Sequence, residues 1–190
     1  LSVTLRGSLT VTNVTNKADV SGDDGAGGFI GGIDNLNQGI VVTFKDCVND
    51  GNIQGVDMLG GFIGYFYRNT DLTMNLSGSI NNANISGKFT AGGFVGHIRR
   101  NTNIKMAIST CTNNGNDTGS IGFTGGFVGY FESNNDITIN ISNCVNNGII
   151  TGKNDLGGFL GTIYDNTNTN MTISNSVNSG NCTGTGSYSG

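Results

Sequence analysis

The side chains in this 190-residue sequence that can do chemistry are one histidine, four cysteines and 13 acids. His97 takes a place that tyrosine or threonine fills elsewhere in the chain, so we expect it on a variable surface. The acids are scattered through turns and lack the paired placement that glycoside hydrolysis needs. No cysteine or histidine spacing fits zinc, and no phosphate loop occurs. The sequence therefore predicts no catalytic, cofactor-binding or metal-binding residue.

Three of the cysteines share one position of a repeated segment, namely Cys47, Cys111 and Cys144. Serine stands there in two other segments, so a small residue filling a tight buried position is the interpretation we favour. The alternative is a disulfide between Cys111 and Cys144, which would lie in neighbouring units about one strand spacing apart. Cys47 lies two units from Cys111 and is out of reach.

The elements that carry these side chains form a repeat array. The phrase Gly-Gly-Phe-aliphatic-Gly occurs five times, with its phenylalanine at Phe29, Phe62, Phe94, Phe127 and Phe159, at intervals of 33, 32, 33 and 32 residues. An asparagine keeps the same period, at Asn16, Asn49, Asn81, Asn113, Asn146 and Asn178. A fixed period of this length is typical of solenoids and propellers.

Each unit reads as three short strands. Apolar and polar residues alternate in 136–142, as they do in the equivalent segments 72–76 and 104–108, and a period of two indicates a strand. The second strand is a brief segment such as 148–151, and the third is 126–131. Polar turns separate them, and no stretch has a helical stripe.

These units predict an all-β fold, a parallel β-solenoid of five full coils and a partial sixth, with 32–33 residues per coil. Equivalent residues would then form ladders, with the phenylalanines stacked inside and the asparagines at a corner that tolerates a left-handed backbone. Phe44, Leu76, Ile108, Ile141 and Ile173 would form a further inner ladder. A β-propeller is less favoured because the unit is short for four strands. A hairpin at 68–71, giving an antiparallel array, remains open.

The third strand is apolar on both faces. Phe62 and Phe66 share one parity, whereas Ile63 and its equivalents are aliphatic on the other. A strand of this kind must be covered on both sides. Either the coil is flattened so that a turn folds over this face, or a second solenoid packs against it.

The segment 143–152 followed by 156–161, Asn-Cys-Val-Asn-Asn-Gly-Ile-Ile-Thr-Gly and then Leu-Gly-Gly-Phe-Leu-Gly, resembles the GLUG-type repeat. The resemblance covers the entire chain, with a somewhat longer unit and phenylalanine after the glycine pair. It implies a scaffold within a large secreted or surface protein, adhesin-like proteins included, and it implies no activity.

Composition is compatible with such a location. The net charge is −4 and only 12% of the residues are charged, so Asn, Ser and Thr must provide solubility. The sequence lacks the basic footprint of a nucleic-acid-binding protein. It also lacks an apolar run near ~18 residues, so we expect no membrane span in this segment. We expect residues 1–190 to be a single array that is a segment of a longer protein or filament, because neither end offers the polar cap of a solenoid.

Seven Asn-x-Ser/Thr sequons are candidate N-glycosylation sites: Asn13, Asn75, Asn84, Asn116, Asn140, Asn170 and Asn181. A sequence this rich in asparagine and hydroxyl residues produces roughly this many by chance. Their positions are more informative than their number, because Asn75 and Asn140 fall at equivalent outward places on the first strand.

The function that we expect is structural: an extracellular or cell-surface rod or filament that self-associates end to end or laterally. The alternative is an adhesin-like module that binds a glycan or a cell-surface protein along one ladder face. Outward aromatic residues such as Tyr65 and Tyr130, together with His97, would be its contacts. We expect no enzyme, although pectinolytic enzymes also use β-solenoids and fold alone does not decide activity.

Overall fold

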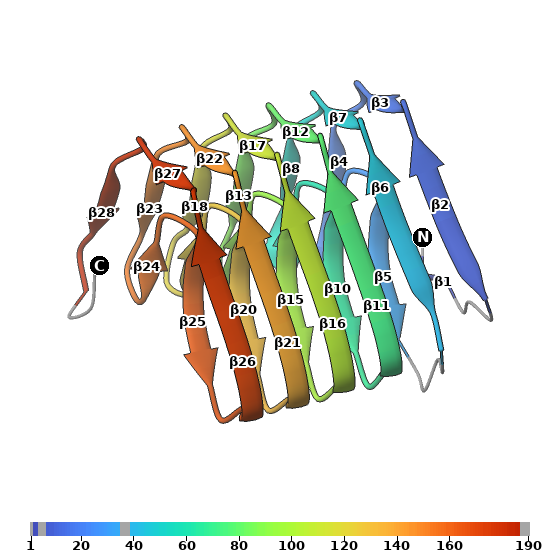
Figure 1. Ribbon diagram of the computed structural model, residues 1–190. Helices are drawn as coiled ribbons and strands as arrows, with labels where there is room; N and C mark the ends of the chain where they lie inside the picture. The colour runs from blue at the N-terminus through green and yellow to red at the C-terminus, as the bar shows by residue number, and fades with distance from the viewer. Residues whose placement is uncertain (1, 4–6, 35–38, 187–190) are drawn as a thin grey trace.

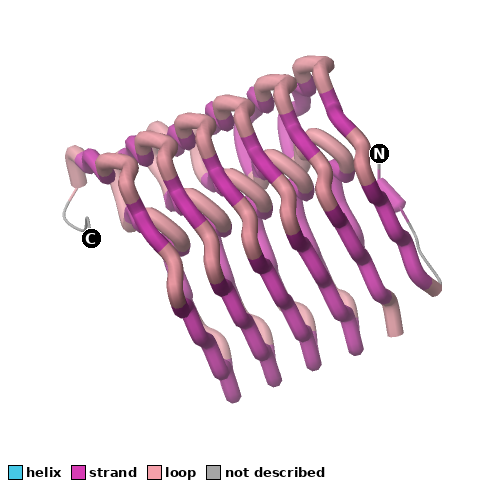
Figure 2. The backbone as a smooth tube through the Cα atoms, turned by 45° about the horizontal axis from the view of Figure 1, so that its top comes forward, coloured by secondary structure: helices cyan, strands magenta, loops and turns pink. Residues whose placement is uncertain are grey.

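The computed structural model describes residues 2–3, 7–34 and 39–186, and these form an all-β parallel solenoid of about five turns (Figure 1). Successive coils stack in one direction, so the two ends of the chain lie at opposite ends of the stack (Figure 2). No helix occurs among the described residues, and so none that could cross a membrane.

Two extended sheets form the long sides of the coil. Sheet A contains β1 (Ser2–Val3), β5 (Ile30–Asp34), β10 (Ile63–Tyr67), β15 (Val95–Arg99), β20 (Val128–Glu132) and β25 (Leu160–Tyr164). Sheet B contains β2 (Ser8–Thr12), β6 (Val41–Lys45), β11 (Thr70–Ser77), β16 (Thr102–Ser109), β21 (Asn135–Ser142) and β26 (Thr167–Ser174).

Three sheets of shorter strands complete the coil. Sheet C contains β3 (Thr15–Asn16), β7 (Val48–Asn49), β12 (Ile80–Asn81), β17 (Thr112–Asn113), β22 (Val145–Asn146) and β27 (Val177–Asn178). Sheet D contains β4 (Val20–Asp24), β8 (Ile53–Asp57), β13 (Ile85–Gly87), β18 (Asp117–Gly119), β23 (Ile150–Gly152) and β28 (Cys182–Gly184). Sheet E contains β9 (Leu59–Gly60), β14 (Thr90–Gly92), β19 (Phe123–Gly125) and β24 (Leu156–Gly157).

The three predicted strands of a unit are strands of sheets B, D and A, and the prediction missed two short ones. Sheets C and E contribute only two or three residues per coil, too few for a pattern of alternation to show in the sequence. Every strand pair is parallel, including β10 with β15 and β11 with β16. The antiparallel array and the propeller are therefore excluded. The segment 68–71 is not a hairpin: residues 68–69 form the turn from sheet A to sheet B, and Thr70 begins β11 (Figure 1).

The main core lies between sheets A and B and is built from the predicted ladders. The phenylalanine rings stack along the axis with centroids 4.8, 4.9, 4.9 and 5.1 Å apart from Phe29 to Phe159. The ladder through Phe44 and Leu76 is in register and buried, except that Ile173, in the last described coil, is 45% exposed. A second, smaller core contains Ile53 and Ile85 of sheet D with residues of sheet E.

The repeated asparagines form a ladder of side-chain hydrogen bonds. Each amide donates to the Oδ1 of the next coil, over 2.8–3.0 Å from Asn16 to Asn178. The expected left-handed backbone was placed wrongly: positive φ occurs three residues earlier, at Asp46 or Asn143 for example. The amides instead lie against the second glycine of the Gly-Gly-Phe phrase, because a Cβ on Gly61 would come within 2.5 Å of the Oδ1 of Asn81.

The prediction that the third strand is apolar on both faces is wrong, because Ile63 and its equivalents Val95 and Val128 belong to the same main core as Phe62 and Phe66. The glycine that follows the aliphatic residue lies against sheet E. A Cβ on Gly96 would be 2.6 Å from the backbone nitrogen and oxygen of Leu59, a separation that real Cβ atoms do not reach. Sheet E thus lies at backbone contact with this part of sheet A.

Candidate binding pocket on sheet A

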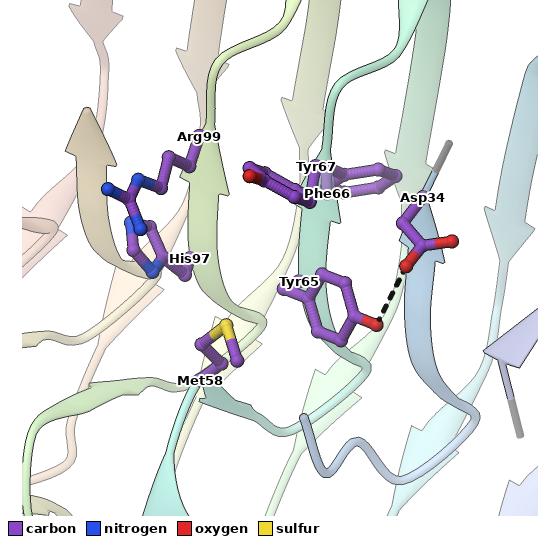
Figure 3. A pocket seen from close by; sticks show the side chains of 7 residues that line it. All are labelled: Asp34, Met58, Tyr65, Phe66, Tyr67, His97 and Arg99. Carbon is purple, nitrogen blue, oxygen red and sulfur yellow. Dashed lines mark hydrogen bonds between the residues drawn. The ribbon is translucent and has the colours of Figure 1, made fainter. Parts of the chain in front are cut away.

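A pocket of about 280 Å³ opens on the outer side of sheet A, where three successive coils meet. Seven residues line it, and they surround the space in Figure 3: Asp34, Met58, Tyr65, Phe66, Tyr67, His97 and Arg99. Six come from β5, β10 and β15, and Met58 comes from the corner between sheets D and E. The pocket therefore exists only when coils are stacked.

Two ranks of residues across sheet A supply most of the lining. One rank runs Gly32, Tyr65, His97, Tyr130 and Thr162, and the other runs Asp34, Tyr67, Arg99, Glu132 and Tyr164. Their outward direction follows from strand alternation, since Phe66 between Tyr65 and Tyr67 is buried in the main core. These ranks vary from coil to coil, so the site is local although the scaffold is periodic.

The carboxylate of Asp57 positions Met58 at the edge of the pocket. Its Oδ1 accepts hydrogen bonds from the backbone nitrogens of Met58 (2.7 Å) and Thr90 (3.1 Å), and from the hydroxyl of Thr90. Met58 has a φ of 56°, a strained conformation for this residue type that the surrounding bonds hold. One thioether is thereby placed beside the aromatic residues of sheet A.

Charges occupy opposite sides of the pocket. On one side the hydroxyl of Tyr65 lies 3.4 Å from Oδ2 of Asp34. On the other, Nε of Arg99 is 2.8 Å from Oε2 of Glu132, and Nε2 of His97 is 3.5 Å from the same oxygen. Burial lowers the pKa of His97, against the raising effects of Asp57 and Glu132. The imidazole is therefore neutral at neutral pH.

Neighbouring rings extend the site along the axis. His97 stacks on Tyr130 with centroids 4.9 Å apart and planes inclined by 24°, and Tyr130 also contacts Phe123 at 4.4 Å. Burial, with a further contribution from Glu132, raises the pKa of Tyr130 to about 12. Both rings keep their neutral forms, so they offer apolar faces with polar edges.

The structure corrects the expectation that His97 lies on a plain surface, because this residue is only 6% exposed. Tyr65 and Tyr130 are half-buried. Asp34, Met58, Tyr67 and Arg99 were missed as lining residues. The sequence shows that the residues of these ranks differ from coil to coil. It does not show that this part of sheet A lies next to the corner that carries Met58.

The arrangement is suited to non-covalent binding. Its lining contains no serine, threonine or cysteine, and the Tyr65 hydroxyl beside Asp34 acts as a hydrogen-bond donor to that carboxylate. Within the described ranges, no group of three or more His, Cys, Asp or Glu side chains is placed to hold a metal ion.

The cysteine position is filled as a small buried site. Each thiol donates to the carbonyl two residues earlier, with Sγ to O distances of 3.2 Å for both Cys111 and Cys144. Ser79 makes the same bond through its hydroxyl at 3.0 Å. Cys111 and Cys144 are neighbours in adjacent coils, as expected, and both thiols are free in the structure. Burial raises the pKa of Cys111. The disulfide stays a prediction.

The sequons lie on strands and corners of the outer surface. Asn13, Asn84, Asn116, Asn140, Asn170 and Asn181 are exposed and Asn75 is half-buried. Asn84 and Asn116 have a structural role, because their Oδ1 atoms accept backbone N–H groups from the next coil at 3.0 and 2.9 Å. Asn140 is exposed beside the small residue Ala107 on sheet B. Glycosylation of any of these sites stays a prediction.

A second buried asparagine ladder escaped the sequence reading. Asn69, Asn101, Asn134 and Asn166 lie at the turn from sheet A to sheet B and donate along the stack over 2.8–3.0 Å. Their Oδ1 atoms also accept the backbone nitrogen of the preceding coil, at 2.8–2.9 Å. Their spacing of 32, 33 and 32 residues in the sequence was a usable signal.

One buried acid was also missed. Asp117 replaces the isoleucine of its rank in sheet D, between Ile85 and Ile150, and is 0% exposed. Its Oδ2 accepts a 2.8 Å hydrogen bond from Asn113, whereas its Oδ1 has no partner among the described residues. Burial raises the pKa of this carboxyl well above its ordinary range.

Comparison with protein-family models, with curated proteins and with solved structures gave no match to this chain. The resemblance to GLUG-type repeats accordingly stays a prediction from the sequence.

Proposed function

We propose that this chain is a structural, non-enzymatic segment of an extracellular or cell-surface protein, and that it forms a rigid rod. The observation that carries the proposal is the continuity of hydrogen bonding along the axis. Two ladders of asparagine side chains, one from Asn16 to Asn178 and one from Asn69 to Asn166, run parallel to the backbone ladders of five sheets.

Bending such a stack is costly. Opening one side of a coil interface breaks short backbone bonds and also separates buried amides, each of which costs about 1–3 kcal/mol when left unpaired. The stacked phenylalanines add apolar contact at every interface. Because each coil contacts only its neighbours, length can be added without changing the cross-section, as a spacer, stalk or fibre requires.

Electron microscopy of dilute native material tests the rod. We expect straight particles of uniform width, and flexible or globular particles would contradict the proposal. Long filaments would demonstrate end-to-end association, whereas separate short rods would limit the function to a spacer. Labelling of intact, unpermeabilised source cells with an antibody against the chain tests the location, and signal only after permeabilisation would refute an outside position.

The pocket on sheet A supports a second candidate function, a surface module that binds a glycan or a protein. It combines aromatic rings with charged groups on opposite sides and lies on the outer face of the stack. Saturable binding that depends on Tyr65 would support this candidate. Binding that is unchanged by substitutions on sheet A would refute it.

A further inference from the structure

The pocket exists because two neighbouring aromatic side chains are held in different directions. Tyr65 extends over the preceding coil, where Gly32 lacks a side chain: a Cβ on Gly32 would collide with the Tyr65 ring, and one on Gly25 would come within 2.5 Å of it. His97 stacks instead on Tyr130 of the following coil. Gly25 and Gly32 thus set the direction of Tyr65, and Tyr130 sets that of His97. Figure 3 shows the Tyr65 and His97 side chains among the residues that line the pocket.

Hydrogen-bonding capacity remains inside this pocket. His97 lines the pocket but is only 6% exposed; its Nε2 lies 3.5 Å from Oε2 of Glu132, and both ring nitrogens are buried. Within the described chain Arg99 makes one ion pair, through Nε, which leaves the N–H groups of its two terminal nitrogens on a side chain that is 38% exposed.

The surroundings argue against a fully charged ligand. Asp34 on one side, with Glu132 and Asp57 close to His97, disfavours an anion. Arg99 disfavours a cation. A neutral ligand must then offer hydroxyl groups that accept from Arg99 and donate to Asp34.

The same ligand must also have an apolar face. Tyr65, Tyr67 and Met58 present rings and a thioether to the pocket. A pyranose ring combines a face of C–H groups with a rim of hydroxyls, so it meets both conditions, whereas a flat apolar molecule would leave the polar groups unpaired.

We propose that this pocket binds one neutral hexose unit of a polysaccharide or of a glycoprotein glycan. Its ring packs against Tyr65, and its hydroxyls pair with Asp34 on one side and with Arg99 on the other, beside the ring of His97. The proposal rests on the second candidate function, binding on sheet A, and is independent of whether the chain polymerises.

The histidine provides the measurement. Because His97 is the one histidine of the sequence, its imidazole signals in a long-range proton–nitrogen NMR spectrum are assigned without ambiguity. The protein is titrated separately with methyl glucoside, methyl galactoside and methyl mannoside, and with glucuronate and inorganic phosphate as charged probes. We expect a saturable shift with at least one neutral sugar and a dissociation constant on the order of 1 mM. A glucan oligosaccharide and a free high-mannose glycan then distinguish the two sources.

Three variants make the result specific. Tyr65→Ala removes the ring, and Gly32→Ala keeps it but displaces it; both should weaken sugar binding at least about tenfold. Tyr164→Ala is the matched control, because Tyr164 belongs to the same sheet and rank as Arg99 but lies outside the pocket and is 60% exposed. It should leave binding unchanged. Thermal melting shows that each variant is folded.

Several outcomes would overturn the proposal: no shift with any neutral sugar at about 20 mM, shifts with glucuronate or phosphate only, or shifts that all three variants retain. The failure of the rod proposal looks different. Microscopy would then show flexible particles while the His97 signals still respond to sugar.

Discussion

Replacement of Asp117 by isoleucine should stabilise the fold. The side chain lies in a rank of sheet D whose neighbours are Ile85 and Ile150, so the surrounding coils already accept isoleucine. Asn113, which donates to Asp117, keeps its other hydrogen bonds in this variant, because its amide nitrogen also donates to the backbone oxygen of Gly115 (3.2 Å) and to Oδ1 of Asn146 (2.9 Å). Asn81 satisfies its amide in the same way beside Ile85.

The magnitude follows from three contributions. Removal of the unpartnered buried Oδ1 should gain about 1–3 kcal/mol, and burial of the isoleucine side chain about 1.5–3 kcal/mol. Loss of the Asn113 bond and crowding against neighbours should cost about 1–3 kcal/mol. The net expectation is about 2 kcal/mol of added stability, which raises the melting temperature by roughly 4–8 °C for a chain of this length.

The dependence on pH provides an independent check. Burial raises the pKa of Asp117 above its unfolded value near ~3.9, so the folded state binds the proton more tightly than the unfolded state does. Wild type should therefore gain stability relative to Asp117→Ile as the pH falls through the raised pKa towards ~4. The advantage of the isoleucine variant should be largest at neutral pH and should shrink in acid.

Thermal unfolding followed by circular dichroism at several pH values is the assay. Asp117→Asn is the matched control, since it keeps a polar group of similar shape without titrating, and Ile85→Asp places an acid in the neighbouring coil and should destabilise the fold. A lower melting temperature for Asp117→Ile, or a gap from wild type that does not change with pH, would refute the reasoning.

Three further predictions concern the ladders, the sheet contact and the histidine. Asn81→Ala should lower the free energy of unfolding by about 2–3 kcal/mol, because it leaves buried amide groups of both neighbouring coils unpaired. Asn82→Ala, on an exposed ladder, should lower it by less than about 0.5 kcal/mol. Denaturant titration of both variants measures the difference. Gly96→Ala should destabilise the fold strongly or prevent folding, since the new Cβ would meet the Leu59 backbone. Gly22→Ala is the control and should fold normally, because its Cβ would lie 3.8 Å from the nearest atom, the Cβ of Ala26. Equal melting temperatures of the two variants would contradict the contact between sheets A and E. Burial lowers the folded pKa of His97, so the stability that the neutral imidazole contributes is present above about pH 6.5 and is lost as the pH falls through the folded pKa. His97→Tyr, which places the residue of Tyr65 and Tyr130 at this position, should therefore reduce the fall in melting temperature between about pH 7.5 and pH 5. An unchanged fall would exclude the buried neutral form of His97.

The sequence by itself determined the architecture, because a repeat places equivalent residues at equal intervals and a stack of coils brings them into register. The phenylalanines from Phe29 to Phe159 and the asparagines from Asn16 to Asn178 were predicted as ladders and are ladders. Alternation identified the strands of sheet B, since eight residues are long enough to show a period of two.

Only the tertiary structure decided the features that depend on how the coil closes. The strands of sheets C and E are too short to carry a pattern, and the glycine role of Gly96 is set by Leu59, which lies 37 positions earlier in the chain and reaches it only after sheet E folds over sheet A. The pocket joins Asp34, Met58 and His97 from different coils and corners. Asp117 matches an isoleucine position in the alignment of units, yet burial and its unpaired oxygen appear only once sheets D and E enclose it. A repeat specifies which residues are equivalent, whereas contacts between different positions of the repeat arise from the closure of the chain in three dimensions.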